Sequence, residues 1–320
     1  MKTLVMAAFW PMVVVSSLYA GSNPAAQQLL TSANQQRDIF HKQADPFQLD
    51  LDFTAQMNVP MSGHYTLRWA AKDRWRSKVV LGGFEETQIQ DGEWTYTARN
   101  ATFTPIRVRE LRSLIRLAAG SNYIGTKSKE RVLDGIHVDC VQAEREDYRR
   151  DVREICIDSS AHDVLSERWD SVPDERDRVV YSDYFEFAGR RYPRNLTMEE
   201  NASRVIKADV TALVAAPFNP VLLTPPKGAI QRRHCPGMKS PLVIKETQLP
   251  TIGMGGDSTV ALTILSDGSV GDVQLEARGG QKLDQANLAT LKQWKFKPAM
   301  CGTEPVVADI EITTSVRERY

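Results

Sequence analysis

Strict alternation of apolar and polar residues marks residues 47–57, which read FQLDLDFTAQM. Side chains alternate along a β-strand, so this pattern predicts a strand with one buried face. Similar patterns follow in HYTLRWAA, RWRSKVVL, EETQIQ and, beyond the turn signal Asp91-Gly92, in the segment that starts at Trp94. Turn signals spaced by roughly 8–12 residues predict an antiparallel sheet, sandwich or barrel.

Two segments have the periodicity of a helix instead. The first runs from Asn23 to about His41, with Pro24 at its start. The second lies in PIRVRELRSLIRLAAG, where apolar residues form one stripe and Gly120 ends the helix. Its other faces carry Arg107, Arg109, Arg112 and Arg116. These arginines indicate either an anionic partner or a face exposed to solvent, and we favour the exposed face.

Strand patterns resume in GIHVDCVQAER, VREICIDSS, RVVYSDYFEFAG, RYPRNLTMEE and SRVIKADVTALV. We therefore expect an antiparallel sheet of about ten strands with two helices, ending near Ala216. The order of helices and strands over residues 24–216 resembles the LolA-like fold, an unclosed half-barrel whose concave apolar face is covered by helices. The resemblance implies a cavity for a lipid or other apolar ligand, unless the protein's own side chains fill it. Candidate lining residues are Phe47, Leu49, Leu51, Phe53, Tyr65, Leu67 and Trp69.

Residues 217–241 contain six prolines and several basic residues but no acidic residue. Such a composition predicts a stiff, extended and exposed linker. The linker divides the chain into a domain at residues 24–216 and a second domain at residues 242–320.

The second domain begins with a hairpin, DSTVALTILSDGSVGDVQLEARGG, whose alternation breaks at Gly271-Asp272 and indicates a β-bulge there. An amphipathic helix follows in LDQANLATLKQWKFKPA, with Leu288, Leu291 and Trp294 on its buried side. Pro298 ends that pattern, and PVVADIEITTSV predicts a third strand.

These three phrases resemble the C-terminal domain of the TonB energy-transducer family. The resemblance implies an α+β domain with a three-stranded sheet and one main helix. In that family the last strand and its neighbours bind a short peptide of an outer-membrane receptor by strand addition. The corresponding residues here are Val306, Val307, Asp309, Ile310, Ile312 and Val316. Alternatively, this strand pairs only within its own sheet or in a dimer.

The N-terminal residues MKTLVMAAFWPMVVVSSLYAG predict a secretory signal peptide at residues 1–20, cleaved after Ala20. The alternative is an uncleaved anchor in the inner membrane that faces the periplasm, which is the one case in which we expect membrane contact. Lys and Arg residues total 40, as do Asp and Glu residues. This balance argues against a nucleic-acid partner.

Four cysteines in an exported chain favour disulfides. Cys140 and Cys156 lie symmetrically about the tip of a predicted hairpin, which places them opposite each other. Cys235 ends the linker, and a bond to Cys301 would tie it to the second domain. The sequence contains no CxxC pair, and His137 and Cys140 alone are too few ligands for a metal site.

No motif of a hydrolase, metalloprotease, P-loop or dinucleotide-binding site occurs in the sequence, and we expect no cofactor. We therefore expect a non-catalytic periplasmic protein of TonB-linked envelope transport, with an outer-membrane receptor or another envelope protein as its partner. The alternative is a periplasmic carrier of lipid or lipoprotein that uses the half-barrel cavity.

Overall fold

The computed structural model describes residues 23–116, 122–146, 148–172, 175–248 and 255–316. The predicted signal peptide therefore lies outside the described residues. Three α-helices are described: α1 (Pro24–Arg37), α2 (Ile106–Ile115) and α3 (Gln281–Leu291). Within this part of the chain, no helix combines the length and apolar character that crossing a membrane requires.

The largest unit of the fold is one antiparallel sheet. It contains thirteen strands where the sequence predicts about ten. In spatial order they are β13 (Ile230–Arg233), β5 (Trp94–Arg99), β4 (Phe84–Asp91), β3 (Arg74–Leu81), β2 (Pro60–Ala71), β1 (Phe47–Gln56), β12 (Ser203–Ala215), β11 (Arg190–Glu200), β10 (Glu175–Phe187), β9 (Val164–Val172), β8 (Tyr148–Asp158), β7 (Ile136–Arg145) and β6 (Tyr123–Leu133). The predicted turn at Asp91-Gly92 joins β4 to β5. The predicted large antiparallel sheet with few helices is confirmed.

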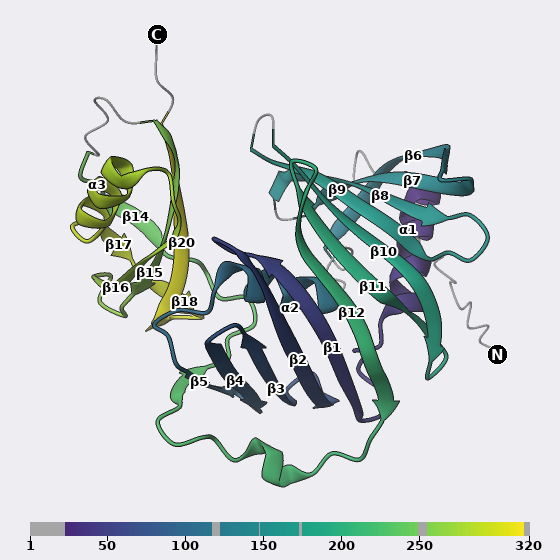
Figure 1. Ribbon diagram of the computed structural model, residues 1–320, viewed down its shortest axis with the longest axis horizontal. Coiled ribbons are helices and arrows are strands. Elements are labelled where there is room, and N and C mark those ends of the chain that lie inside the picture. Colours follow the sequence, from purple (N-terminus) through teal and green to yellow (C-terminus); the bar gives the residue numbers. More distant parts are fainter. Residues whose placement is uncertain (1–22, 117–121, 147, 173–174, 249–254, 317–320) are drawn as a thin grey trace, which may run out of the picture.

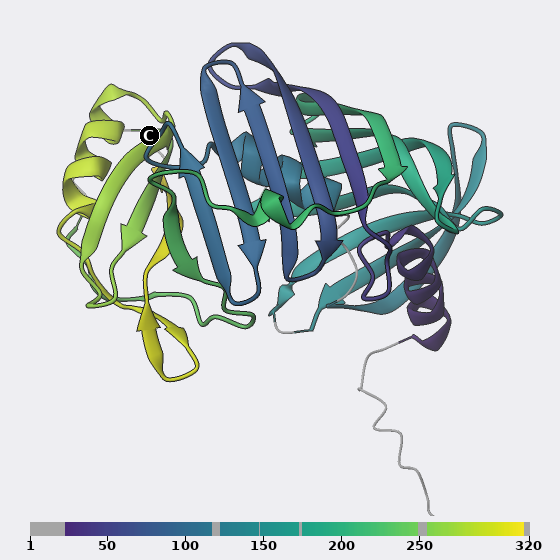
Figure 2. The ribbon, with the colours of Figure 1, turned by 90° about the horizontal axis from the view of Figure 1, so that it is seen from below.

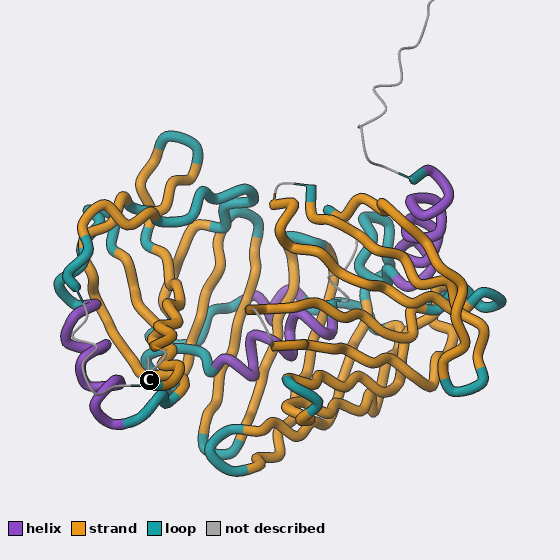
Figure 3. Tube along the Cα trace, turned by 90° about the horizontal axis from the view of Figure 1, so that it is seen from above, coloured by secondary structure: helices purple, strands orange, loops and turns teal. Residues whose placement is uncertain are grey.

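The large sheet curves around α2, and α1 lies at the end that contains β6 and β7 (labelled in Figure 1 and seen from above in Figure 3). Helix α1 starts at Pro24 because the Asn23 side chain accepts hydrogen bonds from the first free backbone N–H groups. The buried face of α2 consists of Val108, Leu111, Leu114 and Ile115. These residues belong to the same apolar core as the inner faces of the strands.

The C-terminal part of the chain forms a separate sheet, with strand order β16 (Val270–Ala277), β15 (Gly256–Ile264) and β20 (Ala308–Val316). Helix α3 packs on one face of this sheet, and the core between them contains Val260, Leu262, Ile264, Leu291 and Phe296. A register shift between Leu262 and Ile264 confirms the predicted bulge in β16. We use the name C-terminal sheet for this three-stranded sheet together with α3 and the two short two-stranded ribbons described next.

Two short ribbons, which the sequence pattern did not predict, flank the three-stranded sheet. One pairs β14 (Leu242–Lys245) with β17 (Lys295–Lys297), and the other pairs β18 (Ala299–Cys301) with β19 (Glu304–Val306). Gly268 in the β15–β16 turn has φ of +81°, and a Cβ atom there would lie 1.9 Å from the carbonyl oxygen of Phe296. Only glycine therefore permits this close approach of the turn to β17.

Trp294 differs from its prediction. Helix α3 ends at Leu291, so Trp294 lies beyond the helix and is half-buried beside Phe296. Its indole N–H donates a hydrogen bond to the carbonyl oxygen of Thr247, at 3.1 Å. Phe296, which the helical pattern did not single out, is the fully buried aromatic residue of this core.

Two disulfides join the same cysteine pairs that the sequence predicts. Cys140 and Cys156 face each other on β7 and β8, with their Cα atoms 3.9 Å apart. Cys235 is bonded to Cys301, with their Cα atoms 5.8 Å apart. The second bond links the segment after β13 to the ribbon β18–β19.

Candidate functional site at the junction of the two sheets

The predicted linker is not a free spacer. Residues 216–229 run across the outer face of the large sheet, where Arg76 donates a hydrogen bond to the carbonyl oxygen of Leu222 in the 3₁₀-helix η1 (Pro220–Leu223) (Figure 2). The chain then forms β13, which extends the large sheet by pairing with β5. These four residues are extended and mostly exposed, as the sequence predicts, but their backbone groups pair with β5 rather than with solvent alone.

Strand β13 places two arginines against the C-terminal sheet. The Arg232 guanidinium donates two hydrogen bonds to the Asp309 carboxylate, at 2.8 and 3.1 Å. Asp309 also accepts a hydrogen bond from Thr263, at 2.9 Å. Arg233 binds Glu304 of β19, at 2.9 Å. Bidentate arginine–carboxylate pairs fix orientation as well as distance, so these contacts set how the two sheets face each other.

Helix α2 makes the second set of contacts with the C-terminal sheet. Pro105 provides no side-chain cap, and the free N–H of Ile106 donates instead to the Glu276 carboxylate on β16, at 3.3 Å. A negative charge at this end also complements the helix dipole. Arg109 pairs with Glu311 on β20 and lies 3.8 Å from Glu276.

The prediction that the arginines of α2 face solvent is wrong for Arg107, Arg109 and Arg112, which are partly buried in ion pairs, whereas Arg116 is exposed. Arg107 pairs with Glu110 and Glu200, and Arg112 pairs with the buried Glu86, at 2.6 Å. Arg116 lies over the ring of Trp75, with its Cζ atom 5.1 Å from the ring centroid. Apart from Glu110, which lies on α2 itself, the carboxylate partners Glu200 and Glu86 lie on distant strands, which helical periodicity cannot reveal.

Two carboxyl groups at this junction have raised pKa values. Burial raises the pKa of Glu110 to about 7, with the negative charges of Glu200 and Glu311 adding to the effect and Arg107 opposing it. Burial also raises the pKa of Glu276, against the opposing charge of Arg109. The junction therefore contains carboxyl groups that resist losing their protons.

The predicted binding strand is divided in the structure. Val306 ends β19, Val307 follows it, and β20 begins at Ala308. Ile310 and Ile312 pack against the core of the C-terminal sheet, whereas Asp309 and Glu311 contact the large sheet and α2. Within the described residues, β20 pairs on one side only, with β15. It is therefore an edge strand, and peptide binding at this edge stays a prediction.

A crevice of about 620 Å³ lies along the segment that leads into β20. On the large-sheet side its lining includes β5, β13 and α2. On the other side it is lined by residues 305–309. Its lining includes Arg99, Arg109, Arg112, Arg232 and Arg233. Asp309 is the one carboxylate among the lining residues that the structure describes.

The seven residues predicted to line an apolar cavity lie on β1 and β2, where each is at most 4% exposed. They form the core of the large sheet together with the buried face of α2. In this structure the protein's own side chains fill that space, so the predicted residues are core residues rather than the lining of an open cavity.

An open groove lies elsewhere on the concave face, between α2 and strands β9–β11. Its volume is about 390 Å³, and its apolar lining includes Leu114, Trp169, Val179, Tyr181 and Met198. Glu311 of β20 also lines it, so the C-terminal sheet forms part of its wall. The alternation pattern could have placed Val179 and Tyr181 on an inner face of the sheet. It could not have predicted that they line an open groove beside α2.

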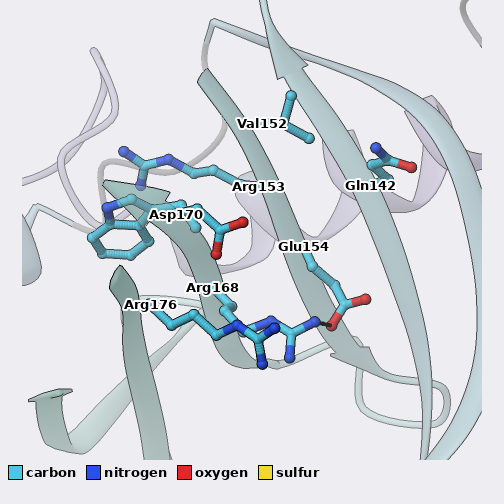
Figure 4. Close-up of a pocket in the computed structure, with 8 residues that line it drawn as sticks. Gln142, Val152, Arg153, Glu154, Arg168, Asp170 and Arg176 are labelled. Carbon is cyan, nitrogen blue, oxygen red and sulfur yellow. Dashed lines mark hydrogen bonds and ion pairs between the residues drawn. The ribbon is translucent and has the colours of Figure 1, made fainter. Parts of the chain in front are cut away.

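A polar hollow of about 520 Å³ adjoins this groove and shares Arg153 and Trp169 with it. In Figure 4 the side chain of Arg168 reaches Glu154, to which it is bonded at 3.0 Å. Arg153 lies over the ring of Trp169, with its Cζ atom 4.5 Å from the ring centroid. Among the residues that the structure describes, no group of three or more His, Cys, Asp or Glu side chains could hold a metal ion.

Comparison with known proteins places both parts of the chain. Residues 250–315 match the family described as the C-terminal domain of the Gram-negative bacterial TonB protein. No curated protein matches the chain.

Among solved structures, a LolA superfamily protein from Nitrosomonas europaea is similar at 13% identity, covering 62% of this chain and 97% of its own, with a TM-score of 0.44. A DUF1329 family protein from Desulfovibrio piger has 12% identity, coverage of 62% and 95%, and a TM-score of 0.45. The MucA/MucB complex of Pseudomonas aeruginosa has 10% identity, coverage of 77% and 82%, and a TM-score of 0.28. At these TM-scores the likeness carries no argument about function. Residues 250–315 thus match the TonB C-terminal family, and they follow in sequence a large sheet that is similar to LolA-superfamily structures.

Proposed function

We propose that the protein is a non-catalytic periplasmic component of TonB-linked envelope transport. In this proposal the C-terminal sheet binds an extended peptide of an outer-membrane receptor or another envelope protein. The family match over residues 250–315 supports it, because those residues include β15, α3 and nearly all of β20. The predicted division into residues 24–216, 217–241 and 242–320, after a signal peptide at 1–20, belongs to the same proposal. An uncleaved anchor in the inner membrane is the alternative to a freely soluble periplasmic protein.

The observation that carries the proposal is the position of β20. An edge strand presents backbone N–H and C=O groups to whatever lies beside it, and an added strand can pair with them. Strand β20 is paired with β15 alone within the described residues, and the partly buried side chains of Ile310 and Ile312 pack it against the core. An incoming peptide would therefore meet a rigid edge at little cost in ordering β20.

Fluorescence anisotropy with the full chain tests this proposal. Labelled peptides from the periplasm-facing segments of outer-membrane receptors of the same genome should bind saturably. A control peptide with N-methyl groups at alternate residues keeps every side chain but loses the backbone donors of one edge. We expect its binding to be lost, and equal binding of the two peptides would exclude strand addition.

The groove beneath α2 favours a second candidate function, that of a carrier of lipid or lipoprotein. Its lining combines aromatic and aliphatic side chains with charged ones, which suits a ligand with an apolar chain and a polar head. Native mass spectrometry of protein purified from the periplasm should then show a bound lipid that is lost in Trp169→Ala. Protein of unmodified mass in both samples would argue against a carrier.

A further inference from the structure

The large sheet contributes to the surroundings of the proposed peptide site. Figure 1 shows β20 on the side of the C-terminal sheet that faces the large sheet, with α3 on the opposite side. The crevice between the sheets follows residues 305–309, which lead into β20. A peptide laid along the start of β20 would therefore enter a space whose other wall consists of β5, β13 and α2.

That wall is rich in guanidinium groups. The crevice is lined by five arginines, which are Arg99 on β5, Arg109 and Arg112 on α2, and Arg232 and Arg233 on β13. The lining also includes neutral hydrogen-bonding side chains, such as Gln88, Thr95 and Thr97. Against five arginines the lining contains one carboxylate, that of Asp309.

We propose that the peptide bound along β20 is acidic, and that arginines of the large sheet and α2 select it. The inference rests on the proposed peptide binding, and it adds the chemistry of the partner. Side chains of an added strand alternate, so those on one face would point toward the arginine-lined wall. Aspartate or glutamate at those alternate positions would be bound from the wall opposite β20.

The arginines have protein partners already, which limits the size of the effect. Arg232 holds Asp309, Arg112 holds Glu86, and Arg233 lies between Glu93 and Glu304. An incoming carboxylate would thus join an existing network of charges rather than neutralise an isolated cation. Electrostatic complementarity of this kind changes specificity and association rate more than affinity. We expect a preference of about 3- to 10-fold for acidic over neutral peptides at low salt.

Three peptides that share one apolar frame test the inference, with glutamate, glutamine or lysine at alternate positions. On the full chain, the glutamate peptide should bind about 3- to 10-fold more tightly than the glutamine peptide, and the lysine peptide most weakly. The difference should shrink as salt rises, because salt screens exposed charges. The double variant Arg232→Gln/Arg233→Gln should bring the glutamate and glutamine peptides to similar affinity. Arg194→Gln, which removes an exposed arginine paired with Asp183 on β10, is the matched control and should leave the preference unchanged.

The outcomes separate this inference from the function on which it rests. Equal affinity of all three peptides for the unaltered chain would overturn the charge preference and leave peptide binding in place. Failure of all three to bind would overturn both. The peptide series on the unaltered chain decides the question even if the double variant does not fold.

Discussion

At the scale of single residues, Leu291 is the clearest anchor of the C-terminal sheet. It is 1% exposed and packs in the core that joins α3 to β15. Leu291→Ala should lower the free energy of unfolding of this sheet by about 2–5 kcal/mol, since truncation of a buried leucine leaves a cavity. Native-state hydrogen exchange of the β15 amides measures this change. Lys292→Ala, at the next and exposed position, should change it by less than about 0.5 kcal/mol, and equal effects would place Leu291 outside the core.

Glu110 predicts a dependence of stability on pH. Its pKa is raised to about 7 in the folded chain, so the folded state holds a proton that the unfolded state releases at lower pH. The contribution is complete below the ordinary glutamate range and is lost as the pH rises through about 7. We expect a loss on the order of 1–3 kcal/mol across this window.

Urea unfolding of the full chain from pH 4 to pH 8 measures the effect. Glu110→Gln should flatten the slope over this window, because glutamine does not titrate. The exposed Glu85→Gln serves as the control and should keep the slope of the unaltered chain. A slope that is unchanged in Glu110→Gln would assign the pH dependence to other groups.

At the scale of secondary-structure elements, the backbone of β13 pairs with β5 and its arginine side chains form ion pairs with Asp309 and Glu304. Trypsin should therefore cut the native chain first at the exposed Lys227, and only slowly at Arg232 or Arg233. Asp309→Asn weakens the bidentate pair with Arg232 and should accelerate cleavage in β13 several-fold. Asp183→Asn, which alters an exposed aspartate paired with Arg194, should not. Mass spectrometry of the first fragments would contradict this account if Arg232 or Arg233 were cut before Lys227.

The strands and helices of the large sheet could be predicted from local pattern, but the junction could not. Alternation of buried and exposed residues identifies β1 correctly from Phe47 onward, because one face of that strand is buried. The arginines of α2 were assigned to solvent because their carboxylate partners, such as Glu86 and Glu276, lie on distant strands. Likewise, β13 carries no alternation long enough to distinguish it from an extended linker. Its pairing depends on the open edge of β5, which is a property of the assembled sheet.

At the scale of the whole molecule, the disulfide Cys235–Cys301 connects the large sheet to the C-terminal sheet across 66 residues of sequence. In the chain-entropy model, closing a loop of this length stabilises the fold by roughly 4 kcal/mol. Cys235→Ser/Cys301→Ser should therefore lower the thermal midpoint and increase the hydrogen exchange of β13 and β19. Cys140→Ser/Cys156→Ser removes a disulfide within one hairpin and should leave exchange at the junction unchanged. Identical exchange of β13 in the two double variants would show that the ion pairs alone hold the junction.

The central claim is that β20 is the open edge at which the C-terminal sheet receives a peptide from the envelope. Hydrogen exchange of the full chain, with and without saturating receptor peptide, tests it most directly. Strand β15 is paired on both sides already, so its amides provide an internal control. We predict that the peptide slows exchange in residues 308–316 at least about tenfold and leaves residues 259–264 unchanged, because only an edge strand gains backbone partners. Protection confined to the groove beneath α2, with no change in β20, would contradict the claim.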